Sequence, residues 1–289
     1  MLYQAELYPE NQSYPLAEPA RKGKIDAGRK APDTRVVTDF SRAWPFGLNG
    51  PRWWIAAGAA LALLALALLF DRLLLLWAQG WPPQIVELLR VATRYGESDW
   101  ILIPSAVLFI VIWVLSFLVR WKLMKLMLLE QAWLFAFIFC AVGLPSLIST
   151  LAKRAIGRGR PMHFDEVSIL GFRPNWLEWD YQSFPSGHAT TAFALAACIG
   201  FLSARWFWPA VGFAVVIGVS RVALGAHYPS DVLGGAILGM LGAYLVRILF
   251  SRRGMLFRRG SNGAIRQRPL AALRRYIKLK RLGSAPTRR

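Results

Sequence analysis

The chain has 289 residues, of which 55% are hydrophobic, and it contains 13 tryptophans. Its mean hydropathy of +0.38 excludes an ordinary soluble enzyme, and several apolar runs approach the roughly 20 residues that a helix needs to cross a bilayer. The formal net charge of +19 lies mostly in two tails outside these runs, which indicates an anionic membrane surface as the partner and no nucleic acid. Both cysteines, Cys140 and Cys198, fall in apolar runs and show no disulfide framework and no metal-ligand spacing.

The chain begins with a polar segment and continues with six apolar ones. Residues 1–50 contain several prolines and mixed charges, so we expect a largely disordered tail and no cleavable signal peptide. The apolar segments of the next part, residues 51–250, are expected to form six transmembrane helices: 53–77, 101–119, 127–151, 189–204, 207–224 and 232–250. The predicted fold class is therefore all-α, an integral membrane bundle with flexible N- and C-terminal tails.

Residues 251–289 form a basic C-terminal tail with 13 Lys or Arg residues and no acidic residue. Within it, the segment 270–282 has the pattern of a basic amphipathic helix. Such a helix is typical of a segment that lies on anionic lipid. The tail shows no recognisable nucleic-acid-binding fold, so we interpret it as a membrane-surface segment.

The distribution of cations predicts the orientation of the helices. Both tails and the link at 120–125 are rich in Lys and Arg, and such segments remain in the cytoplasm. We therefore expect a multi-pass protein of the inner (cytoplasmic) membrane with both termini cytoplasmic and the links 78–100, 152–188 and 225–230 on the outer face. The five cations of the link 152–188 break this pattern, unless one span is miscounted, and we interpret them as ligand-binding groups.

Three polar motifs lie at span ends that this topology brings to one face. The first contains Lys153 and Arg160, which are suited to binding phosphate, although cations at helix ends also extend toward the interface without binding a ligand. The second is Pro185 to His188, which precedes a helix. Here Ser186 is a good N-cap, Gly187 permits close approach of an anion to the backbone, and His188 can protonate a leaving oxygen. A capped helix with a surface histidine would have the same pattern.

The third motif contains Ser220, Arg221, His227 and Asp231. Pro229 is suited to the first turn of a helix, which would place Asp231 in that turn, four residues after His227. The carboxylate can then accept a hydrogen bond from one ring nitrogen and leave the other free to attack. A buried histidine–aspartate pair with a purely structural role is the alternative.

Together, the motifs resemble the three-part signature of the type 2 phosphatidic acid phosphatase superfamily. The signature is Lys, six residues, Arg-Pro; Pro-Ser-Gly-His; and Ser-Arg, five residues, His, three residues, Asp. The sequence matches every position: Lys153, Arg160, Pro161, Pro185, Ser186, Gly187, His188, Ser220, Arg221, His227 and Asp231. The signature spans about 80 residues, and the apolar layout extends the resemblance over roughly 50–250.

The resemblance implies a phosphatase that needs no metal ion or other cofactor. It makes His227 the nucleophile that forms a phosphohistidine, with Asp231 orienting it and His188 as the general acid. It also assigns the phosphoryl oxygens to five groups: Lys153, Arg160, Ser186, Gly187 and Arg221. The superfamily includes soluble vanadium-dependent haloperoxidases, but the apolar spans favour its membrane branch, which acts on lipid phosphates or diphosphates at the outer face.

The shared motif binds only the phosphate, so it does not rank the lipid substrates. Undecaprenyl diphosphate, phosphatidylglycerol phosphate, phosphatidic acid and lipid A phosphates are all candidates. The alternative from another class is a non-catalytic membrane protein that binds or transports a lipid phosphate. The presence of His188, His227 and Asp231 argues against it, because a protein without catalysis would be free to lose them.

Overall fold

The structure is a computed structural model that describes residues 40, 42–45, 53–163, 171–174, 176–261 and 263–268. Most of the expected N-terminal tail (1–50) and the expected amphipathic helix at 270–282 lie outside the described residues. The described chain is almost entirely helical, with one two-stranded sheet near its end. The predicted all-α membrane fold is confirmed.

Five segments of the described chain are long and apolar enough to cross a membrane: α2 (Trp53–Gln79), α3 with α4 (Pro83–Thr93 and Asp99–Leu118), α5 (Lys122–Ile156), η5 with α8 (Ala204–Trp206 and Phe207–Ala223) and α9 (Pro229–Arg252). The expected fourth span is α7 (Gly187–Leu202), whose 16 residues extend about 24 Å at the rise of an α-helix. This is shorter than a hydrocarbon core of about 30 Å. Five of the six expected spans therefore reach full length.

α7 and α9 pack with their backbones in close contact. A side chain at Gly235 would lie 2.4 Å from the carbonyl oxygen of Ser186, and one at Gly239 would lie 2.2 Å from that of Thr190. Both glycines are needed because any Cβ atom would force the helices apart. The contact joins the start of α7 to residues 235–239 of α9, and α5 packs against both helices. The first turns of α7 and α9 carry the second motif and the end of the third.

The core between α5, α7 and α9 continues into a hairpin that the sequence analysis did not anticipate. β1 (Phe257–Arg259) pairs antiparallel with β2 (Ile265–Gln267). Phe257 and Ile265 are buried, and the Phe257 ring lies 4.8 Å from that of Phe137 on α5 in an edge-to-face arrangement. Part of the segment expected to be a tail is thus anchored by apolar side chains that lie among its cations.

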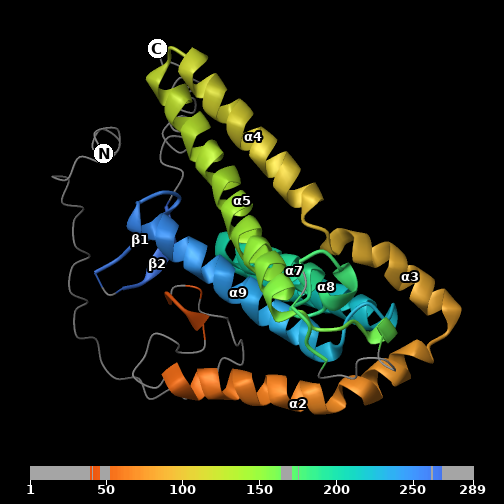
Figure 1. The fold of residues 1–289 in the computed structure, drawn as a ribbon. Helices are drawn as coiled ribbons and strands as arrows, with labels where there is room; N and C mark the ends of the chain where they lie inside the picture. The colour runs from red at the N-terminus through yellow and green to blue at the C-terminus, as the bar shows by residue number, and fades with distance from the viewer. Residues whose placement is uncertain are drawn as a thin grey trace, which may run out of the picture. The chain divides into compact units, whose positions relative to one another are not determined.

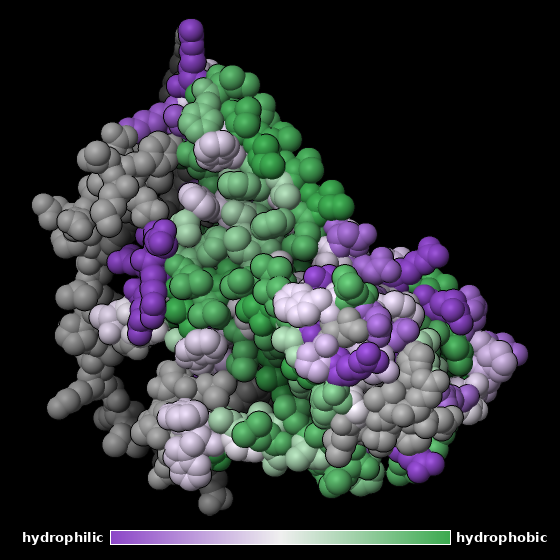
Figure 2. Space-filling model, viewed as in Figure 1, coloured by the Kyte–Doolittle hydropathy of each residue, from purple (hydrophilic) through white to green (hydrophobic). Residues whose placement is uncertain are grey.

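The exposed surface of the long helices is apolar. α4 lies along α5 (Figure 1), and Figure 2 shows a broad hydrophobic surface over these two helices, with hydrophilic residues gathered toward α3. Large side chains such as Leu69, Ile103 and Leu118 are more than half exposed. Since water-soluble proteins rarely expose large contiguous apolar surfaces, this surface is suited to contact with lipid.

Candidate active site

The first motif lies at the end of α5. Lys153 is in the last turn, and Gly157 follows the helix in the left-handed conformation with φ of 67°. A side chain at position 157 would meet the carbonyl oxygen of Arg173 at 2.1 Å, so this turn requires glycine. Beyond it, the amide of Arg160 donates to the carbonyl oxygen of Asp180 at 2.9 Å. The turn therefore ends the helix that carries Lys153 and starts the ordered loop that carries Arg160.

The second motif begins α7. Ser186 occupies the N-cap position, as expected, but its hydroxyl makes no capping hydrogen bond. Its Oγ is buried and has no hydrogen-bond partner among the described residues, while its amide donates to the carbonyl oxygen of Asp231 at 3.0 Å. A side chain at Gly187 would lie 3.2 Å from Nζ of Lys153. A buried hydroxyl without a partner, followed by a residue that faces an ammonium group, is suited to an anionic ligand.

The third motif surrounds the loop between α8 and α9. Arg221 lies in the last turn of α8 and its Nη1 donates to Oγ1 of Thr93 at 3.0 Å. Its buried Nε has no hydrogen-bond partner within the described part of the chain. Nδ1 of the buried His227 lies 3.7 Å from Oδ2 of Asp231, and Ser183 Oγ lies 2.5 Å from the same oxygen and 3.5 Å from Nδ1. The carboxylate faces Nδ1, which leaves Nε2 as the attacking nitrogen.

The start of α9 agrees with the sequence prediction. The helix begins at Pro229 and carries Asp231 in its first turn. The amide of Tyr228 donates to Oδ2 of Asp231 at 2.8 Å. The same carboxylate thus caps the helix and faces the histidine, so the local helix start fixes the geometry of the pair.

The three motifs meet in one place. Lys153 is close enough to Arg160 and Arg221 for their charges to interact, and His188 lies in the combined field of these three cations and of His227. Cations held so close together repel one another. An anion bound between them would relieve this repulsion, and a phosphoryl group has both the charge and the number of acceptor oxygens to do so.

Arg160 is held in place by the loop around it. Its guanidinium lies 4.5 Å from the centroid of the Trp179 ring, and its Nε and Nη1 donate to the carbonyl oxygens of Trp179 and Ala226 at 3.1 and 3.4 Å. Burial lowers the pKa of Arg160, although the nearby carboxylates of Asp231 and Asp180 oppose the shift. An arginine remains charged even so, and here it is oriented before a ligand binds.

The environment of His227 keeps its ring neutral. Burial lowers its pKa to about 4, against the opposing effect of Asp231. Arg160 and Arg221 add to the lowering. A neutral imidazole has a free lone pair on one nitrogen, so His227 is in the protonation state that a nucleophile requires near neutral pH.

This pKa shift predicts a loss of stability in acid. The unfolded chain protonates His227 below about pH 6.5 and the folded chain only near its pKa of about 4, so between these values the unfolded state binds more protons and stability falls as the pH falls. For this group the whole loss is at most about 3 kcal/mol. Thermal unfolding in detergent, followed by tryptophan fluorescence, should show a smaller acid-induced decrease for His227→Gln than for the unchanged protein. Equal decreases in the two proteins would contradict the lowered pKa of His227.

Several residues at the site were missed by the sequence analysis. Asp71, Arg158, Ser183 and Ser230 are all buried, and all four are hydrogen-bonded to one another or to Asp231. One signal was present: a carboxylate within an apolar span is costly and therefore indicates a function. The hydroxyls gave no such signal, because serine is common at helix starts and in loops.

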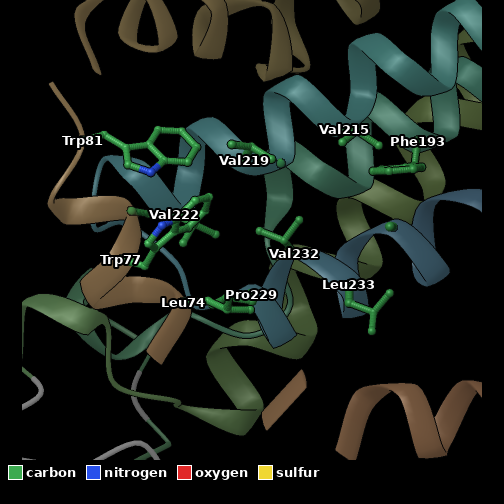
Figure 3. Close-up of a pocket in the computed structure, with 13 residues that line it drawn as sticks. Leu74, Trp77, Trp81, Phe193, Val215, Val219, Val222, Pro229, Val232 and Leu233 are labelled. Carbon is green, nitrogen blue, oxygen red and sulfur yellow. The ribbon is translucent and has the colours of Figure 1, made fainter. Parts of the chain in front are cut away.

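A separate apolar hollow lies between α2, α7, α8 and α9 (Figure 3). Its volume is about 290 Å³, and its lining includes Leu74, Trp77, Phe193, Val219 and Val232. None of its lining residues is charged, so it cannot provide phosphate chemistry. The polar site at the helix ends is therefore the candidate active site. Within the described ranges, no group of three or more His, Cys, Asp or Glu residues could hold a metal ion.

The chain is similar in sequence to several named phosphatases. The lipid A 1-phosphatase of Rhizobium johnstonii is 34% identical over 218 residues, which cover 75% of this chain and 88% of that protein. The undecaprenyl-diphosphatase BcrC of Bacillus subtilis is 40% identical over 63 residues, or 22% of this chain and 33% of its own. A solved PAP2-type phosphatidylglycerolphosphate phosphatase from Bacillus subtilis has 27% identity and a TM-score of 0.41, and the match covers 66% of this chain and 87% of that one.

The family model of the PAP2 superfamily matches residues 131–255. This range contains all three motifs and the whole of the helices α7, α8 and α9. Since the match to the lipid A 1-phosphatase also extends over most of both proteins, the chain belongs to the PAP2 superfamily.

Proposed function

We propose that this membrane lipid phosphatase acts through a phosphohistidine intermediate and removes the 1-phosphate of lipid A. The observation that carries the mechanism is the convergence of a buried neutral histidine with a second histidine and three cations. Phosphoryl transfer depends mainly on positioning and on the stabilisation of charge. A fixed set of cations around a nucleophile meets both requirements.

In the first step, Nε2 of His227 attacks phosphorus and the bond from phosphorus to the lipid oxygen breaks. Asp231 accepts a hydrogen bond from Nδ1–H and stabilises the positive charge that develops on the ring. The anionic phosphate bound between the cations offsets their field and lets His188 carry a proton. His188 donates this proton to the leaving oxygen, so the lipid departs as an alcohol. The non-bridging oxygens are held by the phosphate cradle, which we define as Lys153, Arg160, Ser186, Gly187 and Arg221.

In the second step, water attacks the phosphohistidine. His188, now neutral, accepts a proton from the water, and the bond from phosphorus to Nε2 breaks. Inorganic phosphate leaves and His227 returns to its neutral form. The proton that His188 gave up in the first step is regained in the second, so the cycle closes without any further co-reactant.

The choice of lipid A rests on the extent of similarity. The undecaprenyl-diphosphatase BcrC matches over only 63 residues, whereas the lipid A 1-phosphatase matches over 218. The signature contacts only the phosphate group, so the residues that recognise the rest of the lipid must lie outside it. Similarity across most of both chains is therefore a better indication of which lipid is the substrate than a match to the signature alone.

We also propose that the site faces the outer side of the inner membrane, with both termini in the cytoplasm. The cations of the two tails and of the link at 120–125 support this orientation. Beyond the hairpin, the basic residues up to Arg289 would bind anionic lipid on the cytoplasmic surface. The membrane domain would then extend from about residue 51 through the hairpin.

The direct test measures phosphate release by the purified protein in detergent with a metal chelator present. The panel is lipid A, undecaprenyl diphosphate, phosphatidylglycerol phosphate and phosphatidic acid, and mass spectrometry identifies the products. We expect the highest kcat/KM with lipid A and loss of its 1-phosphate, without added metal. A faster reaction with another lipid would reject lipid A as the substrate. No release from any lipid would favour the non-catalytic binding or transport alternative.

A further inference from the structure

α2 contributes a buried carboxylate to the active-site end of the bundle. Asp71 is fully buried in a helix that is otherwise almost entirely apolar. Its Oδ1 accepts a hydrogen bond from the amide of Ser230 at 2.8 Å, and its Oδ2 accepts from Ser230 Oγ at 2.6 Å and from Arg158 Nη2 at 2.8 Å. A carboxylate within a membrane helix is tolerated only with such partners. Ser230 directly precedes Asp231, so α2 is attached next to the proposed catalytic pair.

Arg158 joins Asp71 to Asp231. It is 1% exposed, and its Nη1 donates to Oδ1 of Asp231 at 2.5 Å and to Ser230 Oγ at 2.7 Å. Its guanidinium also lies 4.6 Å from the centroid of the Tyr228 ring. Burial opposes the charge, but the two carboxylates outweigh it and raise the pKa of Arg158. With both terminal nitrogens engaged in this way, Arg158 is not part of the phosphate cradle, although it is only two residues from Arg160.

The Asp231 carboxylate is consequently held at both oxygens. Arg158 binds Oδ1, while Ser183 Oγ and the amide of Tyr228 bind Oδ2, which faces His227. We propose that Asp71 and Arg158 are positioning residues, which hold Asp231 in the orientation that directs Nε2 of His227 at the phosphorus. They act through Asp231 and do not touch the substrate.

This inference rests on the proposed phosphatase reaction and predicts a specific kinetic change. Asp71→Asn and Arg158→Gln should each lower kcat about 10- to 100-fold, the usual cost of removing a group that orients a functional side chain. The KM for lipid phosphate and the inhibition constant of orthovanadate should change by less than about threefold, because the cradle is intact and its binding is separate from the chemical step. The double variant should lose little more than either single one, because the two residues act as a unit.

Arg247→Gln is the matched control for loss of a buried arginine. Arg247 is also 1% exposed, but it donates to the carbonyl oxygens of Phe40, Arg42 and Ala43 and lies 4.3 Å from the Phe201 ring. The Arg247→Gln variant should have a lower thermal unfolding temperature, while its kcat per folded molecule stays near that of the unchanged protein. If Asp71→Asn or Arg158→Gln fails to fold, Asp71→Glu and Arg158→Lys replace them. Since lysine lacks the fork that reaches two carboxylates, Arg158→Lys should retain an intermediate kcat.

Two results would overturn the proposal. One is a kcat per folded molecule within about threefold of the unchanged protein, which would mean that the network contributes no more than packing. The other is a raised KM and a raised orthovanadate inhibition constant at constant kcat, which would mean that Arg158 binds phosphate directly. If the unchanged protein releases phosphate from none of the lipids, the proposed function itself fails, which is a separate outcome.

Discussion

Replacing His227 with alanine is expected to lower phosphate release by at least about 10⁴-fold, a loss typical of removing a catalytic nucleophile. Two of the described groups nearest to it have other roles. His188 is assigned to proton transfer, and the serine hydroxyl beside Nδ1, Ser183 Oγ, is hydrogen-bonded to Asp231. Binding of orthovanadate should remain, because the cradle is unchanged. The measurement is phosphate release from lipid A together with a vanadate-binding titration.

His188→Gln separates the two steps of the same mechanism. Without its general acid and base, the protein should release phosphate slowly, and the phosphohistidine should accumulate if its hydrolysis is slowed more than its formation. An acid-labile, base-stable phosphate on the protein would identify it. His163→Ala, which changes the remaining histidine, should leave turnover unchanged. Near-normal turnover of His227→Ala would exclude the proposed nucleophile, whatever the other variants do.

The arrangement of the three motifs could be predicted because each is tied to a helix end. Proline at position 229 starts α9 and glycine at position 157 follows α5, so local rules place the polar residues at the membrane boundary. Counting cations then placed these ends on one face. Neither inference depends on how each helix is rotated about its own axis.

The contacts of the positioning residues, Asp71 and Arg158, could not be predicted, because they depend on how the helices are rotated and on the path of a loop. Asp71 meets Ser230 across 159 positions of the chain, and this pairing depends on the rotation of α2 against α9. The choice between Arg158 and Arg160 is similar: the two lie in a loop without periodicity, and the turn at Gly157 decides which one points inward to Asp231. The hairpin was missed because its two buried anchors are short apolar interruptions in a basic segment.

The close contact between α7 and α9 gives the second large expected effect. The double substitution Gly235→Ala with Gly239→Ala places two Cβ atoms within 2.4 Å of the backbone carbonyl oxygens of Ser186 and Thr190, at the start of α7. Neither helix backbone can yield locally, so the helices must separate. Overpacking of this kind costs about 1–3 kcal/mol or more at each position, and we expect most of the protein to be lost to misfolding. Thermal unfolding and the monodisperse fraction after size-exclusion chromatography measure this loss.

The single variant Gly239→Ala connects this packing to catalysis. Separation of α7 from α9 would move His188 away from His227, and a displacement of about 1 Å costs on the order of 10²-fold in rate. Gly58→Ala and Gly212→Ala are the matched controls, because a side chain at either position meets nothing within 4 Å. Since alanine favours helix over glycine by about 1 kcal/mol, both controls should be neutral or slightly stabilising and fully active. If Gly239→Ala behaved like them, the close contact between α7 and α9 would not be what aligns the two histidines.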